Sequence, residues 1–467
     1  MTGRTYRLPT PDRTGWMLGL GAPQIISLGT GLAIAVIIVS RTGSPTLAAM
    51  PFVASLGMAF TRIGGAPILE SLDAGIRRAI RWRHQRFRVP FPFPGPELVL
   101  PRSFTRSRFI EADTGAGPVL VGLDRRNGIA AATLRVAAPA PFLLCDESEQ
   151  VRFLDTFGDA LAPLCREGGP VTSLRWVSFA APAGRPLQEG PPNGPASASY
   201  REVVDLLAGE AHHEVFVTVT VAGRRRGGGP DRVVDVLMGE VQLLTDRLSG
   251  AGLASTPLDP ANFGRMLRRR LDPIGRGSPD HLALLPAAAG MVAAAGPMCV
   301  AESRSRLLVD ATAHRAYHVV EWPRSEVPPG WTADLLLALP LIRAVCVVFE
   351  PVSLRASRRA VERLAAKLDS DEEQRRRIGF RVGAEQQATR GELTAREHEL
   401  VAGHPEFDYS GFVVLSACDA DELDELESQA RSVAAAAGIE LATCRGRQAE
   451  GFAVTLPVPL IPSGWRR

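Results

Sequence analysis

The sequence of 467 residues contains a single lysine, Lys367, and this scarcity excludes one common class of site. A P-loop requires Gly-Lys-Ser/Thr after a strand, because its lysine contacts the phosphates of the bound nucleotide. Lys367 lies in the segment ERLAAKLDS, with no glycine loop before it and Leu368 after it. The sequence therefore predicts that this chain has no Walker A nucleotide site.

Cysteine is also scarce, since the chain has six and none of them forms a CxxC pair. Their wide spacing and apolar neighbours predict reduced cysteines of a cytosolic core, not a disulfide framework or a zinc site. His314 and His318 are four residues apart, but they lie at the start of a predicted strand and no HExxH motif is present. Since no GxSxG motif is present either, the sequence nominates no catalytic, metal or cofactor site and favours a protein that is not an enzyme.

Charge is absent from two stretches near the N-terminus, which run from Arg13 to Arg41 and from Arg41 to Arg62. The first, Gly15 to Ser40, exceeds the roughly 20 residues that a helix needs to cross a bilayer. The second, Thr42 to Thr61, is less apolar and contains two prolines. We expect a transmembrane hairpin in residues 1–68, with two buried helices of a soluble protein as the alternative.

Arginines dominate the residues around this expected hairpin. Residues 1–90 hold eleven arginines and three acidic residues, a net charge of +8, so the remainder of a chain with net charge +3 carries −5. The positive-inside rule therefore predicts a multi-pass protein of the cell membrane with cytoplasmic N- and C-termini. The residues expected at the membrane surface are Trp16, Arg77, Arg78, Arg81, Arg83, Arg86 and Arg88.

The region that follows, residues 69–101, combines helical periodicity with a proline-rich end. Apolar residues recur at helical spacing from Leu69 to Phe87 with arginines between them, which predicts a basic amphipathic helix along lipid headgroups. DNA is the alternative ligand, because a cationic helix attracts either kind of phosphate. Val89 to Pro96 reads VPFPFPGP and predicts an extended linker.

The remaining chain is expected to form an α+β cytoplasmic part in two halves, residues 102–280 and 281–467. Each half reads ββαβαβαβ, beginning in the first half with a hairpin whose turn contains Asn127-Gly128. The uncharged segment Leu282 to Ala301 is interpreted as a loop and short helix between the halves. A duplicated fold is a hypothesis that rests on element order alone.

A charged helical stretch from Ser353 to Gly403 lies within the second half. Only its beginning has an apolar stripe, which includes Leu354, Val361 and Leu368. We expect a helical arm, residues 353–403, that is either a solvated excursion or a docking element for a partner.

Specific segments of this sequence resemble known membrane families. Tyr6-Arg7-Leu8-Pro9, Arg13, Gly19-Leu20 and Gln24 resemble the N-terminus of PrgI-like proteins, which are inner-membrane subunits of type IV secretion and conjugation machines. The rest resembles an uncharacterised family of actinobacterial integral membrane proteins, and its soluble part also resembles the N-terminal region of type IV secretion ATPases. The shared segments are REGGPVTSLRWV (166–177), Ser199-Tyr200, Gly296-Pro297-Met298, VVEWPRSEV (319–327), EPVS (350–353), RRRIGF (375–380), REHELVAGHPEFDYSGFV (396–413) and FAVTLPVPL (452–460).

The resemblance implies a non-catalytic platform of a type IV secretion-like or conjugative system, which docks a separate ATPase and other membrane subunits in an oligomeric assembly. It brings no catalytic residues. We expect the hairpin to pack against other membrane helices through the small residues Gly29, Ala33 and Gly57. The alternatives are a membrane component of type VII secretion and a membrane-tethered enzyme.

Overall fold

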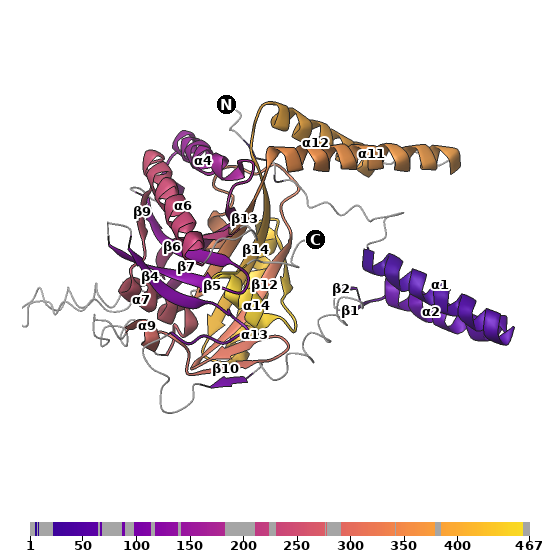
Figure 1. The fold of residues 1–467 in the computed structure, drawn as a ribbon, viewed down its shortest axis with the longest axis horizontal. Coiled ribbons are helices and arrows are strands. Elements are labelled where there is room, and N and C mark those ends of the chain that lie inside the picture. Colours follow the sequence, from indigo (N-terminus) through magenta and orange to yellow (C-terminus); the bar gives the residue numbers. More distant parts are fainter. Residues whose placement is uncertain are drawn as a thin grey trace, which may run out of the picture.

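The computed structural model describes residues 5–6, 8, 22–63, 66–67, 86–88, 98–113, 117–138, 142–182, 211–223, 230–275, 277, 291–340, 342–378 and 384–460. Within these residues the chain has a large body, a two-helix hairpin near the N-terminus and a two-helix arm that projects from the body (Figure 1). The body is built on one 13-stranded sheet whose neighbouring strands are antiparallel. The α+β class predicted from the sequence is confirmed.

The N-terminal hairpin consists of α1 (Ala22–Thr42) and α2 (Pro45–Phe60), which lie side by side (Figure 1). Gly43 adopts a φ of 65° in the turn between them, a conformation that glycine adopts without a steric penalty. Two short strands, β1 (Arg62–Ile63) and β2 (Ala66–Pro67), follow α2 and pair with each other. Among the helices in the described ranges, none has both the length and the apolar character required of a membrane span.

The first half of the body contains six strands and three α-helices among the described residues. They are β4 (Arg108–Asp113), β5 (Pro118–Asp124), β6 (Ile129–Ala137), α4 (Glu147–Leu161), β7 (Val171–Pro182), β8 (Ala211–Ala222), α6 (Pro230–Gly250), β9 (Ala254–Pro257) and α7 (Pro260–Leu271), with short 3-10 helices η2 (Phe142–Leu144) and η3 (Ala162–Cys165) on either side of α4.

The second half repeats this order, with the arm between β13 (Arg343–Val352) and β14 (Glu406–Ala417). Its elements are α9 (Met291–Ala294), β10 (Cys299–Glu302), β11 (Leu307–Val309), β12 (Thr312–Glu321), α10 (Ala333–Leu337), β13 (Arg343–Val352), α11 (Leu354–Ile378), α12 (Ala384–Val401), β14 (Glu406–Ala417), α13 (Ala420–Ala436), β15 (Glu440–Thr443) and α14 (Gln448–Val454). The arm consists of α11 and α12, and it lies between two strands that are neighbours in the sheet.

The strand order places the two halves symmetrically about the pair β7 and β13. From this pair outward the order is β8, β6, β5, β4 on one side and β14, β12, β11, β10 on the other. β9 pairs with β6, and β15 pairs with β12 in the same way. The elements of the predicted ββαβαβαβ order are present where they fall on described residues; residues 183–210, between β7 and β8, lie outside them. The structure adds β4 and α7 in the first half and β10 and α14 in the second.

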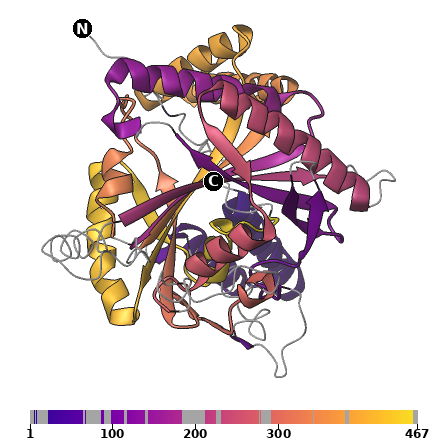
Figure 2. The same ribbon diagram turned by 90° about the vertical axis from the view of Figure 1, so that its left-hand side faces the viewer.

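The helices cover the two faces of the sheet as separate layers. On one face, α7 and α14 pack on a core that extends across both halves and includes Val177, Phe216 and Cys346. On the other face, α4 and α6 cover a core in the first half, and α10 and α13 cover a core in the second. Figure 2 shows α4 and α6 on one side of the twisted sheet and α7 on the other.

One predicted element is wrong at its C-terminal end. Arg86–Arg88 form a strand, β3, and not the last turn of the basic helix expected from Leu69 to Phe87. β3 pairs with β10 at the edge of the sheet, and Phe87 packs against the main core while Arg86 and Arg88 are exposed. Helical periodicity did not indicate this segment correctly because its partner, β10, is more than two hundred residues away in sequence.

Candidate functional site

The surface of the N-terminal hairpin is apolar. Of 20 exposed large hydrophobic side chains among the described residues, 13 belong to α1 and α2. They are Ile26, Leu32, Ile34, Val36, Ile37, Val39, Leu47, Met50, Phe52, Val53, Leu56, Met58 and Phe60. Soluble proteins rarely expose a contiguous apolar surface of this extent, so the hairpin is suited to contact lipid or other apolar helices.

The two helices of this hairpin cross at Gly31 and Ser55. A Cβ atom at Gly31 would lie 2.1 Å from Ser55 Oγ, and Ser55 is only 3% exposed. At the predicted packing residues Gly29 and Gly57, an added Cβ atom would meet no other atom within 4 Å, and Ala33 is exposed. Gly31 therefore serves the contact within the hairpin, whereas Gly29, Ala33 and Gly57 lie on surfaces open to a partner.

Both sequences that flank the hairpin pair with the body. Before it, Tyr6 and Val327 form an isolated bridge in which each backbone N–H donates to the other's carbonyl oxygen, at 2.8 and 2.9 Å. After it, β3 pairs with β10. Of the residues predicted at the membrane surface, Trp16, Arg77, Arg78, Arg81 and Arg83 lie outside the described residues.

The arm is a helical hairpin with a small core of its own. Val361 and Leu368 of α11 pack with Leu393 and Leu400 of α12. Arg390 of α12 also forms ion pairs with Asp369 and Glu372 of α11. The arm is therefore an ordered pair of helices that projects from the sheet (Figure 1).

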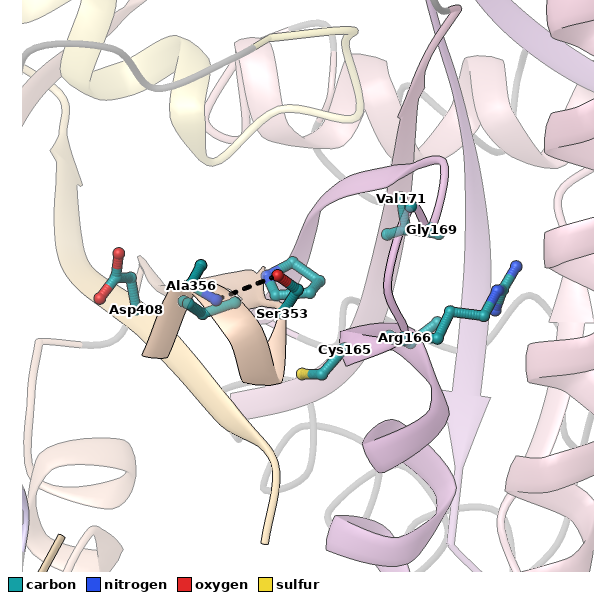
Figure 3. Close-up of a pocket in the computed structure, with 11 residues that line it drawn as sticks. Cys165, Arg166, Gly169, Val171, Ser353, Ala356 and Asp408 are labelled. Atoms are coloured by element: carbon teal, nitrogen blue, oxygen red, sulfur yellow. Dashed lines mark hydrogen bonds between the residues drawn. The ribbon is translucent and has the colours of Figure 1, made fainter. Parts of the chain in front are cut away.

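A pocket of about 340 Å³ lies at the foot of the arm. It is formed where η3 and the turn after it meet the end of β13, the start of α11 and the start of β14 (Figure 3). The residues that determine its chemistry are Cys165, Arg166, Gly169, Ser353, Ala356 and Asp408. Ser353 caps α11, because its Oγ accepts from the Ala356 N–H at 3.4 Å and its carbonyl accepts from Ser357 N–H at 2.9 Å.

The side chains around this pocket do not form a reactive pair. Burial raises the pKa of the Cys165 thiol to about 11, so the thiol is protonated at neutral pH and is a poor nucleophile. Its Sγ donates to the Glu406 carbonyl oxygen at 3.2 Å. Arg166 points away from Ser353 (Figure 3) and donates to Glu240 of α6. The pocket therefore offers a binding surface more readily than a catalytic one.

The two histidines that the sequence singled out both lie in β12, where His314 is buried and His318 is half-buried. His314 donates from Nε2 to the Leu271 carbonyl oxygen at 2.9 Å and accepts at Nδ1 from Ser416 Oγ at 2.8 Å. Burial lowers the pKa of His314 and of His318 to about 4. Within the described part of the chain, no group of three or more histidine, cysteine or acidic side chains is arranged to hold a metal ion.

The predicted core character of the cysteines holds for some of them. All six are free; Cys165, Cys346 and Cys444 are buried, whereas Cys418 is exposed. Two arginines that no sequence pattern selects are fully buried beside Cys346. Arg175 donates to the carbonyl oxygens of Val454, Leu456 and Val458, and Arg270 donates to that of Thr455. These arginines fix the segment 454–458 in the main core.

Comparison with known proteins adds no relative: no family model matches this chain, and no curated protein matches it.

Proposed function

We propose that this protein is a non-catalytic membrane platform subunit of a type IV secretion-like or conjugative translocation system, and that it binds a separate ATPase. Residues 1–68 anchor it in the cell membrane as a two-helix hairpin, with the N- and C-termini in the cytoplasm. The body presents the arm to partners.

The inference that α1 and α2 anchor the protein in the membrane is based on the exposure of 13 large hydrophobic side chains on these helices. Placing such side chains in lipid removes from water an apolar surface that the body does not cover, and each Å² contributes about 25 cal/mol. The described helix α1 begins at Ala22, but the uncharged sequence begins before it at Gly15.

The attachment of both flanks supports the orientation. Tyr6 precedes the hairpin and β3 follows it, and both pair with the same body. A hairpin whose two flanks contact one body enters and leaves the membrane on the same side. The positive charge of residues 1–90 favours the cytoplasmic side for both flanks.

The described residues contain no assembled reactive site, and a structural role requires none. The assignment to type IV secretion rests on the resemblance of the N-terminal and body segments. The arm and the pocket at its foot provide surface for a motor. No observation on the described residues favours type VII secretion.

Purification of the full-length protein from its host membrane in mild detergent tests this proposal. Recovery with a P-loop ATPase of the conjugation type would support it, whereas recovery with a type VII core would replace it. Recovery of a soluble protein without detergent would refute the anchor.

A labelling experiment tests the orientation separately. A cysteine introduced by Thr42→Cys, at the exposed end of α1, should react with a membrane-impermeant maleimide added to intact cells. Cys418, which is exposed on the body, is the internal control and should react only after the cells are permeabilised. Equal labelling of both cysteines only after permeabilisation would contradict the proposed topology.

A further inference from the structure

A row of arginines occupies the outward face of the first turns of α11. Arg355, Arg358, Arg359 and Arg363 are all exposed. Arg355, Arg359 and Arg363 form one stripe, because residues three and four apart share a helix face. This stripe lies on the other side of the helix from Val361, whose side chain packs in the core of the arm. These three residues therefore lie on the side of α11 away from the core of the arm, and Arg358 lies at the margin of this side.

These arginines do not stabilise the arm. The N-terminus of a helix favours negative charge, yet the first turn of α11 contains no acidic residue. Among the described residues none of the four arginines has a carboxylate partner in an ion pair, and Arg363 Nε instead donates to the Arg359 carbonyl oxygen at 3.0 Å. By contrast, Arg390 joins the two helices through two ion pairs.

The arginine row leads to the pocket at the foot of the arm. Ala356 lines this pocket, and Arg359 and Arg363 follow it at i+3 and i+7 on the same stripe of α11. Exposed apolar side chains flank the same end of the arm, since Leu354 begins α11 and Val401, which is 74% exposed, ends α12. We call the pocket, Leu354, Val401 and the four arginines the arm-base surface.

The charge pattern of the arm distinguishes between classes of partner. Glu362 interrupts the arginine row, and Asp369 and Glu373 follow on the exposed side of α11. Residues 353–403 hold eleven basic and nine acidic residues, so the arm is almost neutral. A nucleic-acid backbone is uniformly negative and favours an extended basic surface. A short basic row with apolar and acidic neighbours instead complements a protein surface of mixed character.

We propose that the arm-base surface docks an acidic segment of a partner protein, with carboxylates along the arginine row and a small side chain in the pocket. This proposal rests on the proposed function, in which the partner is the motor protein of the translocation system. It places the contact with the partner at the foot of the arm and attributes the binding to charge complementarity.

Binding of defined probes to the purified full-length protein, in a neutral detergent, tests the proposal. The probes are a fluorescein-labelled peptide of glutamate, serine and leucine, its counterpart with lysine in place of glutamate, and a labelled DNA duplex. The variant combines Arg358→Glu, Arg359→Glu and Arg363→Glu. The matched control combines Arg108→Glu, Arg125→Glu and Arg126→Glu, which change the same charge on exposed residues at β4 and the β5–β6 turn.

The acidic peptide should bind the wild type and bind the arm variant roughly tenfold more weakly, since a few exposed charge pairs each change affinity by a few-fold. The control variant should bind it as the wild type does, and the lysine peptide should bind only the arm variant. Equal peptide binding by all three proteins would overturn the proposal. DNA binding that only the arm variant loses, without peptide binding, would replace the protein partner with nucleic acid.

This assay does not depend on the identity of the system. If co-purification fails to recover an ATPase but the acidic peptide binds at the arm-base surface, the proposed function fails and the docking surface stands. If an ATPase is recovered equally well with the arm variant and the peptide does not bind, the docking surface fails and the platform function stands.

Discussion

Acidification should destabilise the body through two histidines of β12. His314 and His318 have pKa values of about 4 in the folded protein because burial disfavours their charged forms. His314 is closed in by Leu271, Ser416 and the ring of Phe452, whose centroid is 4.5 Å from the imidazole centroid. Protonation of Nδ1 would remove the acceptor of the Ser416 hydroxyl.

The sign and size of the effect follow from proton linkage. In the unfolded chain both histidines titrate near pH 6.5, so the unfolded state binds protons that the folded state does not bind as pH falls from about 6.5 to about 4. The contribution of these two neutral histidines to the free energy of unfolding is therefore fully present above about pH 6.5 and declines as the pH falls below it. Lowering the pH from 7 to 5 costs about 2 kcal/mol for each histidine, or about 4 kcal/mol in all.

Denaturant unfolding of the full-length protein, followed by tryptophan fluorescence between pH 5 and pH 7, measures this slope. The His314→Gln variant keeps a donor for the Leu271 carbonyl oxygen but does not titrate, so it should lose about half of the pH dependence. His404→Gln, at an exposed residue, is the control and should retain the wild-type slope. An unchanged slope in His314→Gln would refute the assignment of a neutral buried imidazole.

Three further predictions concern the hairpin, the C-terminal segment and the arm. Gly31→Ala should separate α1 from α2 and destabilise the hairpin by about 1–3 kcal/mol, measured by denaturation in detergent, whereas Gly29→Ala should not. Arg175→Met should cost about 1–3 kcal/mol, because it removes the guanidinium donor of the Val458 carbonyl oxygen, whereas the Val454 and Leu456 oxygens keep the Cys346 thiol and the Val458 N–H; faster hydrogen exchange near Val458 is the expected sign. Leu368→Ala should cost the arm about 2–4 kcal/mol and make it sensitive to proteolysis while the sheet remains folded.

Local patterns in the sequence were sufficient for most of the secondary structure. The Asn127-Gly128 signal predicted the β5–β6 turn, where Gly128 has a φ of 63° and the Asp124 carboxylate accepts from the Arg126 and Asn127 N–H groups. The predicted ββαβαβαβ order of the second half likewise included the strands β12, β13 and β14, and the charged stretch 353–403 indicated the arm. These features depend on residues close together in the chain.

Features that depend on distant residues were missed. α7 reads PANFGRMLRRRL, which contains too many arginines for a core helix, yet Arg268 and Arg270 are buried. Arg268 is paired with Asp272 and Asp310, at 2.9 and 2.6 Å, and Arg270 donates to the Thr455 carbonyl oxygen. Asp272 directly follows α7, but Asp310 and Thr455 come from distant parts of the chain, so the sequence of α7 alone does not signal that both arginines are buried.

In the candidate site, too, features set by nearby residues were predicted and features set by distant residues were missed. The sequence identified the apolar hairpin and the arm from composition, and packing of Gly29, Ala33 and Gly57 against other membrane helices stays a prediction. It did not indicate the contact of Gly31 with Ser55 within the hairpin. Which glycine lies at a crossing depends on the relative rotation of two helices, and several small residues in α1 satisfy the composition equally. The pocket at the foot of the arm requires η3, β13 and β14 to converge, which element order alone does not reveal.

The position of the arm explains how a partner bound there would act on the body. The arm leaves the sheet at Val352 and returns at Glu406, and these two residues are paired with each other at the ends of β13 and β14. β13 is held on its other side by β7, and β14 by β12, so neither strand is at an edge. A force applied to the arm by a partner is therefore distributed over the four strands β7, β13, β14 and β12, near the junction of the two halves. An arm attached to an edge strand would transmit the same force to one neighbour, so this insertion point suits a rigid docking element.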